Sequence, residues 1–352
     1  MSVESVITEN LDVWTSAIKT KSASGRGSSN KLELYGIKKL RELILELAIR
    51  GKLVSQDTSN EPASDMLKRV EEERARLIKD KRIKKQKHRA VDETPFALPQ
   101  GWAWARLPEV SFYKPGKTPA TKQAVFWDEG VTGLQWVSIS DMNDQGTVED
   151  TSRKVSIKAK NEVFKSDLVP AGTLLMSFKL TVGKVSLLGV DAFHNEAIIS
   201  IFPFSGISQK YLMNVLPKQS NAGNKKQAIK GNTLNSESLA DILIPVPPEK
   251  EQERITSKLD ELMALCDQLE SQTESSIEAH KTLVETLLAT LTNAKDANEL
   301  NESWQRISEH FDTLFTTEDS IDQLKQTILQ LAVMGKLVKQ DPNDEPASAL
   351  LA

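Results

Sequence analysis

Four short segments in the middle of the chain place cations and amides beside glycine, proline or threonine, a composition typical of polar turns. They supply the candidate DNA-contacting residues Lys114, Lys117, Thr118, Lys179, Thr181, Lys184, His194, Asn195, Lys225, Lys226, Lys230 and Asn232. Lysine ammonium groups suit phosphates, whereas asparagine and histidine can reach base edges in a major groove. Each segment alone is an ordinary surface turn. Four of them in one region favour binding to double-stranded DNA.

Catalytic chemistry, by contrast, has no recognisable signature in this sequence. No glycine-rich loop followed by Lys-Ser/Thr is present, and the four histidines have no cysteine or carboxylate at metal-ligand spacing. The single cysteine, Cys266, lies in an apolar helical stripe, where a packing role is expected. We therefore expect no catalytic residue, metal ion or cofactor in this chain itself.

Charge is distributed unevenly along the 352 residues. Residues 249–352 hold 21 acidic and 9 basic side chains, so the first 248 residues carry +8 within an overall charge of −4. A polyanion would therefore meet the first part of the chain. No apolar run approaches the ~18 residues of a membrane span, and no secretory signal opens the sequence. Together with a single cysteine, these features predict a cytoplasmic protein without a membrane segment.

A repeat separates the two ends of the chain. Residues 37–68 and 321–352 align without gaps, and 17 of the 32 positions are identical, including the tetrapeptides Gly51–Val54 and Gly335–Val338. The offset is too long for a solenoid, whose period is about 20–50 residues. The repeat instead marks one large module and the opening of the next.

Composition divides the chain into three predicted domains. Residues 1–92 are helical with a basic tail, residues 93–248 form a mixed α/β domain, and residues 249–352 combine a long helix with the second repeat copy. The fold class is therefore α+β, with strands expected at 104–112, 134–140, 173–178, 184–188, 197–202 and 239–246 and a helix at 208–216. Residues 302–315 are expected to form a short amphipathic helix.

The last domain opens with a predicted coiled-coil helix over residues 249–293, which contain neither proline nor glycine. A helix of that length spans roughly 65 Å and needs a partner helix to cover its apolar stripe. With the first repeat helix, the stripe supplies the candidate dimer or subunit interface: Leu40, Leu47, Ile255, Leu259, Leu262, Cys266, Leu269, Leu283 and Leu287.

A basic run ends the first domain. The sixteen residues Arg74–Arg89 hold nine Lys/Arg and one acid, and we expect them to continue a helix that starts at Pro62. Such a run is either a solvated helix end or a tail that contacts phosphates. A phosphate contact would make DNA affinity fall steeply with salt.

Several longer motifs resemble those of specificity (S, HsdS) subunits of type I restriction–modification enzymes. Leu98-Pro-Gln-Gly-Trp-Ala-Trp104 is similar to the entry of that family's target recognition domain, and Ile244-Pro-Val-Pro-Pro-Glu-Lys-Glu-Gln-Glu-Arg-Ile255 to its exit. Gly116-Lys-Thr-Pro119, Gln135-Trp-Val-Ser-Ile-Ser-Asp141 and Ser177-Phe-Lys-Leu-Thr-Val-Gly183 are similar to its internal landmarks. The resemblance covers nearly the whole chain and implies one target recognition domain flanked by helical conserved regions.

The resemblance also implies function and partners. Such subunits direct methyltransferase (M) and motor-nuclease (R) subunits to a bipartite DNA site, and S-adenosylmethionine, ATP and Mg belong to those partners. A complete member carries two recognition domains, whereas this chain shows one. We therefore expect a homodimer of half-length subunits that reads a symmetric, interrupted target.

Two other classes of function fit parts of the sequence. A coiled-coil scaffold whose inserted domain binds protein would also explain the acidic end, and it would lack salt-dependent DNA binding. An enzyme with an unfamiliar site in residues 95–247 would act on nucleic acid without partner subunits.

Overall fold

The computed structural model describes residues 3–20, 32–222, 226–228, 231–338, 343, 345 and 347–350. The chain divides into two units by its internal contacts. The first unit is Met1–Trp14 with Lys38–Leu265, and the second is Thr15–Ile37 with Cys266–Ala352. Packing thus groups the first repeat copy, the α/β region and the start of the long helix together.

A five-stranded sheet forms the centre of the first unit. Its strand order is β4-β12-β8-β10-β6, and every neighbouring pair is antiparallel except the parallel pair β10 and β6. The strands are β4 (Ser111–Pro115), β12 (Ile198–Pro203), β8 (Leu174–Ser177), β10 (Val185–Leu188) and β6 (Gly146–Val148). β8 and most of β12 are buried, so this sheet carries the core of the unit.

Three smaller sheets complete the strands of this unit. The first has the order β11 (Phe193–His194), β5 (Leu134–Val137) and β7 (Arg153–Val155). The second has the order β13 (Lys226–Ala228), β14 (Gly231–Thr233) and β9 (Lys179–Leu180). The third pairs β15 (Leu243–Val246) with β3 (Ala103–Arg106), which joins the two ends of the α/β region.

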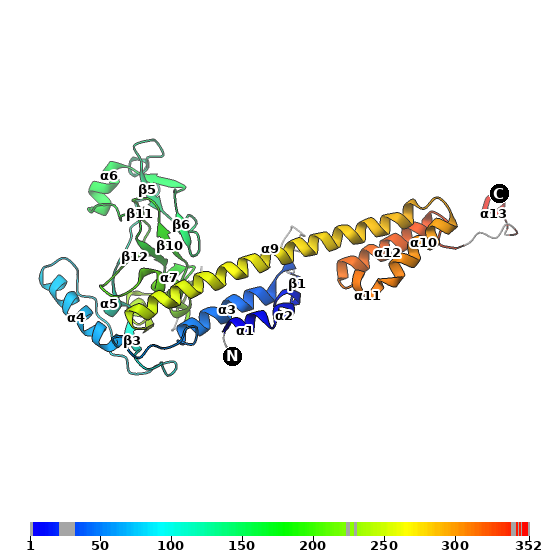
Figure 1. The fold of residues 1–352 in the computed structure, drawn as a ribbon. Helices are drawn as coiled ribbons and strands as arrows, with labels where there is room; N and C mark the ends of the chain where they lie inside the picture. Colours follow the sequence, from blue (N-terminus) through cyan, green and yellow to red (C-terminus); the bar gives the residue numbers. More distant parts are fainter. Residues whose placement is uncertain are drawn as a thin grey trace. The chain divides into compact units, whose positions relative to one another are not determined.

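The main helices up to α9 are α1 (Val3–Thr8), α2 (Leu11–Ser16), α3 (Tyr35–Ile49), α4 (Ala63–Lys79), α5 (Leu107–Val110), α7 (Gln209–Ala222), α8 (Ser236–Ala240) and α9 (Glu249–Asn293). They lie either near these sheets, as α4, α5 and α7 do, or along α9, as α1 and α3 do (Figure 1). Short turns of helix occur at η1 (Ala124–Phe126), α6 (Ile157–Ala159) and η2 (Lys160–Phe164). No described helix combines the length and apolar character needed to cross a membrane.

Two predicted strands are wrong in part, for local reasons. The strand expected at 104–112 is interrupted by α5, because Pro108 lacks an N–H and fits the first turn of a helix. The strand expected at 239–246 begins only at Leu243, because the Asn235 side chain accepts a hydrogen bond from Ser238 N and caps α8. The predicted helix at 208–216 is present and extends to Ala222.

The helix expected through the basic run also ends early, at Lys79. Lys81 adopts a left-handed φ of 56°, and the N–H of Arg82 bonds to Leu77 O at 2.9 Å, closing the helix. The prediction of a helix up to Arg89 is therefore wrong, because contacts to the α/β region replace helical hydrogen bonds beyond this point.

Within the first unit, α3 lies beside the start of α9 (Figure 1). The Arg41 guanidinium donates a hydrogen bond to Met263 O at 3.5 Å. Leu40 and Ile44 from α3 and Ile255 and Leu259 from α9 are each 1% exposed or less. The apolar residues at heptad spacing in this part of α9 are therefore covered by α3 of the same chain.

The second unit contains the antiparallel pair of β1 (Lys19–Thr20) and β2 (Leu32–Glu33) and the end of α9. It also contains α10 (Ala297–Glu309), α11 (Phe311–Leu314), α12 (Glu318–Val333) and α13 (Ala347–Leu350). The helix expected at 302–315 therefore starts earlier and breaks at His310. The buried core of the second unit consists of Val284, Leu288, Leu291, Ile307, Leu314, Phe315, Leu324 and Leu331.

The α9 stripe changes its period between the two units. Spacings of four and three continue from Ile255 to Leu269, whereas the positions of α9 after Glu270 that are buried or half-buried are 273, 277, 280, 284, 287, 288, 291 and 292. Most of these positions follow steps of four, four and three, an eleven-residue repeat that favours a right-handed supercoil over the left-handed one of a heptad. The predicted seam residue Leu283 is consequently 50% exposed, and Val284 takes the buried position.

Candidate nucleic-acid interface

Strand topology brings the predicted DNA-contacting loops to one edge of the five-stranded sheet. β4 and β8 both run antiparallel to β12, so their carboxyl ends meet the amino end of β12. Gly116 N donates to Ile198 O at 3.1 Å, and Phe178 N donates to Ala197 O at 2.9 Å. Loops that lie far apart in sequence, such as those at Gly116 and Ala197, therefore adjoin.

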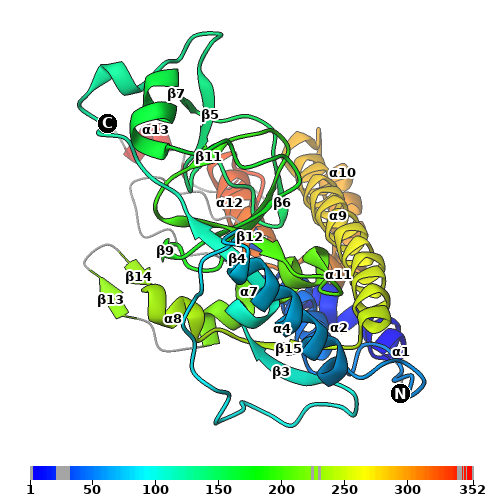
Figure 2. The same ribbon diagram turned by 90° about the vertical axis from the view of Figure 1, so that its left-hand side faces the viewer.

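The fourth predicted segment joins the same edge through β14. Figure 2 labels β13, β14 and β9 in this region. In the register of β14 with β9, Asn232 pairs with Leu180 and Thr233 with Lys179. We call this region the loop edge and define it as residues 114–118, 178–184 and 194–197 with β14. Lys225 and Lys230 lie outside the described residues, and Lys226 and Asn232 are placed by backbone only.

Several predicted contact residues brace the loop edge from within. The Lys117 ammonium donates to Val163 O at 2.8 Å and to Phe164 O at 3.1 Å, carbonyls at the end of η2. The Thr118 hydroxyl bonds to Glu196, and the Lys184 ammonium donates to Ile139 O at 3.4 Å. These bonds hold the loops together, and they occupy donors that were expected to face a ligand.

Other predicted residues face outward. The side chains of Lys114 and Thr181 are exposed, and those of Lys179 and Asn195 are half-buried. The ammonium groups of Lys114 and Lys179 lie 5.5 Å and 5.2 Å from the rings of Phe112 and Phe178. A cation within about 6 Å of a ring centre is weakly attracted to the ring, and an ammonium group has three hydrogens, so it can also donate to phosphate oxygens.

His194 lies in β11 and is 3% exposed, so its prediction as a loop-tip residue is wrong. Burial lowers the pKa of its imidazole to about 4, which keeps the ring neutral near pH 7. A Cβ at Gly116 would lie 1.9 Å from His194 O, so β4 closes tightly onto this residue. His194 therefore supports the loop edge from beneath.

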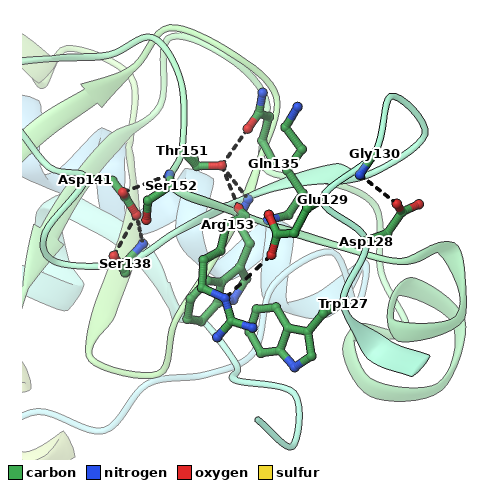
Figure 3. A network of polar contacts seen from close by, with 12 residues as sticks. Trp127, Asp128, Glu129, Gly130, Gln135, Ser138, Asp141, Thr151, Ser152 and Arg153 are labelled. Atoms are coloured by element: carbon green, nitrogen blue, oxygen red, sulfur yellow. Dashed lines mark hydrogen bonds and ion pairs between the residues drawn. The ribbon is translucent and has the colours of Figure 1, made fainter. Parts of the chain in front are cut away.

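A polar network whose residues were not among the predicted DNA-contacting residues adjoins the loop edge (Figure 3). Gln135 donates from Nε2 to Asp150 Oδ1 at 2.9 Å and accepts from the Thr151 hydroxyl at 2.5 Å. The backbone N–H of Thr151 and the Gln135 amide lower the pKa of Asp150. These bonds fix the direction of the Gln135 amide, which is the preorganisation that base readout requires.

Asp141 forms the second centre of the network. Burial disfavours its charged form, but hydrogen bonds from Ser138 and Ser152 outweigh burial and lower its pKa. Ser138 N and Ser152 N donate to this carboxylate at 2.8 Å and 3.0 Å. Asn195 N, which belongs to the loop edge, donates to Val137 O at 3.0 Å. The Ser138–Asp141 turn begins at the next residue, so it lies beside the loop edge.

A stacked arginine completes the network (Figure 3). The guanidinium carbon of Arg153 lies 3.4 Å from the centre of the Trp127 ring, and its Nε lies 3.7 Å from Glu129 Oε1. A guanidinium held against an indole ring can present its planar set of donors to a base or phosphate. The separation of 26 residues gave no signal in the sequence.

Most residues predicted to lie in a dimer or subunit interface pack inside this chain instead. Leu40, Ile255, Leu259, Leu262, Cys266 and Leu269 are buried within the single chain. Leu47 and Leu287 are half-buried. Most of this apolar stripe is thus already covered without a second chain.

Among the described residues, no group of three or more His, Cys, Asp or Glu side chains is arranged to hold a metal ion.

Comparisons with known proteins identify the family. The family model described as type I restriction modification DNA specificity domain matches residues 99–279. The specificity subunits of the type I restriction enzymes EcoAI and EcoEI from Escherichia coli are 46% and 43% identical over 368 and 366 aligned residues. Both alignments cover 100% of this chain and 60% of the relative.

A solved HsdS subunit from Thermoanaerobacter tengcongensis aligns at 17% identity with a TM-score of 0.38, over 86% of this chain and 66% of that chain. The sequence relatives and the matched domain confirm the resemblance drawn from the entry and exit motifs. This chain belongs to the type I restriction–modification specificity subunits, a family named for DNA specificity rather than for a catalytic activity.

Proposed function

We propose that this chain reads double-stranded DNA through the loop edge and directs M and R subunits to one half of a bipartite site. The observation that carries the proposal is the convergence of four sequence-distant loops at one sheet edge. Lys114 and Lys179 would contact phosphates there, while Asn195 and the fixed Gln135 amide would face base edges. Catalysis, with S-adenosylmethionine, ATP and Mg, would belong to the partner subunits.

The test is adenine-methylation mapping in cells that express this chain with the methyltransferase subunit of its own system. A bipartite, interrupted motif is the expected result. Simultaneous replacement of Lys114, Lys179 and Gln135 by Ala should abolish methylation at that motif. If the chain yields no sequence-dependent methylation, a protein-binding scaffold becomes the better account.

We also propose that two copies of the chain pair, which would bring two recognition domains together. The chain spans 60% of the length of the relatives that it matches. The apolar stripe of α9 from Ile255 to Leu269 is already buried within one chain, so it is not available for pairing. The support for pairing comes from α12 instead.

The two repeat copies differ in how they are covered. Ile37, Ile44, Ile49 and Leu53 are 1%, 0%, 2% and 6% exposed in the first copy. Their equivalents Ile321, Ile328, Val333 and Leu337 are 40%, 38%, 90% and 50% exposed. Because the same apolar positions bury in one copy and not in the other, the α12 face is the proposed pairing surface. Two identical recognition domains would then read a symmetric motif, whereas an asymmetric motif would contradict pairing.

A further inference from the structure

The basic run after α4 forms an ordered strap, which we define as residues 80–90. Gln86 Nε2 donates to Tyr113 O at 3.0 Å, and Arg106 Nη2 donates to Ala90 O at 3.1 Å. Arg74 contacts His88 Nε2 at 3.2 Å and Pro108 O at 3.1 Å. The strap is therefore fixed to the α/β region at several points, unlike a solvated helix end.

Its residues alternate between anchors and cations. Ile83 is half-buried and lines a small cavity with Phe112 and Phe204, while Gln86 and His88 are half-buried as well. The cations between these anchors are exposed: Lys81, Arg82, Lys84, Lys85 and Lys87. None of the five forms an ion pair with any described residue. Only Arg89, at the end, is neutralised, by Glu237 and by Asp241 at 3.9 Å.

Five unpaired cations on seven consecutive residues repel one another, so a fixed arrangement of this kind favours an external polyanion. In an extended segment these residues span at most about 20 Å at ~3.3 Å per residue. Phosphates along one DNA strand rise by about 3.4 Å each, so this length matches several successive phosphates. Lysine provides a point charge without the planar donors that distinguish bases.

The position of the strap links it to the loop edge. A cavity of about 530 Å³ is lined by Gln86 and Lys87 from the strap, by Pro115 and Phe178 from the loop edge region, and by α8. The ammonium group of Lys114 lies 5.5 Å from the centre of the Phe112 ring, and Phe112 lines the small cavity with Lys84 and Lys85 of the strap. The strap cations therefore lie close to Lys114, an outward lysine of the loop edge.

We propose that the strap is a second DNA-contacting element, in which Lys81, Arg82, Lys84, Lys85 and Lys87 bind the phosphate backbone independently of sequence. This inference rests on the proposed DNA recognition and adds affinity rather than specificity to it. It also separates two roles within the chain: base selection at the loop edge and phosphate binding on the strap.

The test compares three forms of the full chain in complex with its methyltransferase subunit. The strap variant replaces all five cations by Gln. The control variant replaces five other exposed lysines by Gln: Lys52, Lys250, Lys281, Lys295 and Lys325. Both variants lose five positive charges. Dissociation constants are measured by fluorescence anisotropy for a target duplex and a scrambled duplex between 50 and 300 mM salt.

The strap variant should bind both duplexes at least about tenfold more weakly at 100 mM salt, and its log–log salt slope should be shallower by about 2–4. The ratio of target to scrambled affinity should stay within about twofold of the original chain. The control variant should change neither slope nor ratio.

Equal slopes for the strap and control variants would overturn the inference while leaving DNA recognition intact. Loss of the methyltransferase from the strap variant, with DNA affinity of the free chain unchanged, would also overturn it, since the strap would then dock protein. If the original complex binds no DNA, the proposed function fails together with the inference.

Discussion

At the residue scale, Gly116 makes the loop edge possible. A Cβ there would meet His194 O at 1.9 Å and Asn195 O at 2.4 Å, both of them backbone atoms that cannot move aside. Gly116→Ala should therefore lower the free energy of unfolding by about 2–3 kcal/mol or more and weaken DNA binding. The control is Gly130→Ala, whose Cβ meets only the Asp128 carboxylate at 3.0 Å. Equal urea midpoints for the two variants would contradict the tight closure of β4.

His194 gives a pH prediction at the same scale. Its pKa is about 4 in the folded chain and 6.5 in the unfolded chain, so the folded state favours the neutral ring. The stability that this provides is complete above pH 6.5 and is lost as the pH falls towards 4. Between pH 7.5 and pH 5 the original chain should lose about 2 kcal/mol more than His194→Gln in urea unfolding. An identical loss in both proteins would mean that the imidazole is accessible to protons.

At the element scale, Glu251 ties the start of α9 to two other segments. Its Oε1 accepts hydrogen bonds from Trp102 Nε1 at 3.0 Å and Gln56 Nε2 at 2.8 Å, and the side chain is 1% exposed. This junction joins the first repeat, the entry motif and the exit helix. It holds the α/β region on α9.

Burial raises the pKa of Glu251, so its charged form is disfavoured in the fold. The associated stability is present below the unfolded pKa and is lost as the pH rises through the folded pKa. Glu251→Gln should therefore be at least as stable as the original chain at pH 7.5, with a difference that shrinks towards pH 4. Glu251→Ala should cost about 1–3 kcal/mol, because it leaves Trp102 without its acceptor. Thermal unfolding across this pH range measures both effects, and a destabilised Gln variant at pH 7.5 would refute them.

At the scale of the whole molecule, pairing should depend on the exposed face of α12. Leu329 and Val333 are 66% and 90% exposed, so charge there should not disturb the fold of one chain. Leu329→Glu with Val333→Glu should convert a dimer into a monomer in sedimentation at micromolar concentration. Val13→Glu with Val131→Glu, at sites 59% and 102% exposed, should leave the dimer intact. A monomeric original chain, alone and with its methyltransferase, would refute pairing.

The sequence by itself determined the elements that depend on local signals. The absence of proline and glycine between residues 249 and 293 predicted α9 with its observed bounds, and Gly51 ends its repeat helix with a left-handed φ of 64°. The entry and exit motifs predicted the family, which the relatives confirm. Periodicity and glycine act within a few residues, so they are legible along the chain.

Tertiary structure alone decided which of these residues meet. Pairing of β4 and β8 with β12, and of β14 with β9, brought the four loops together, and pairing of β11 with β5 placed His194 in a buried strand. The same kind of distant contact stacked Arg153 on Trp127 and drew residues 80–90 out of a helix. Hydrogen-bond register between strands far apart in sequence depends on the whole packed sheet. The spacing of residue types along the chain therefore does not predict this register.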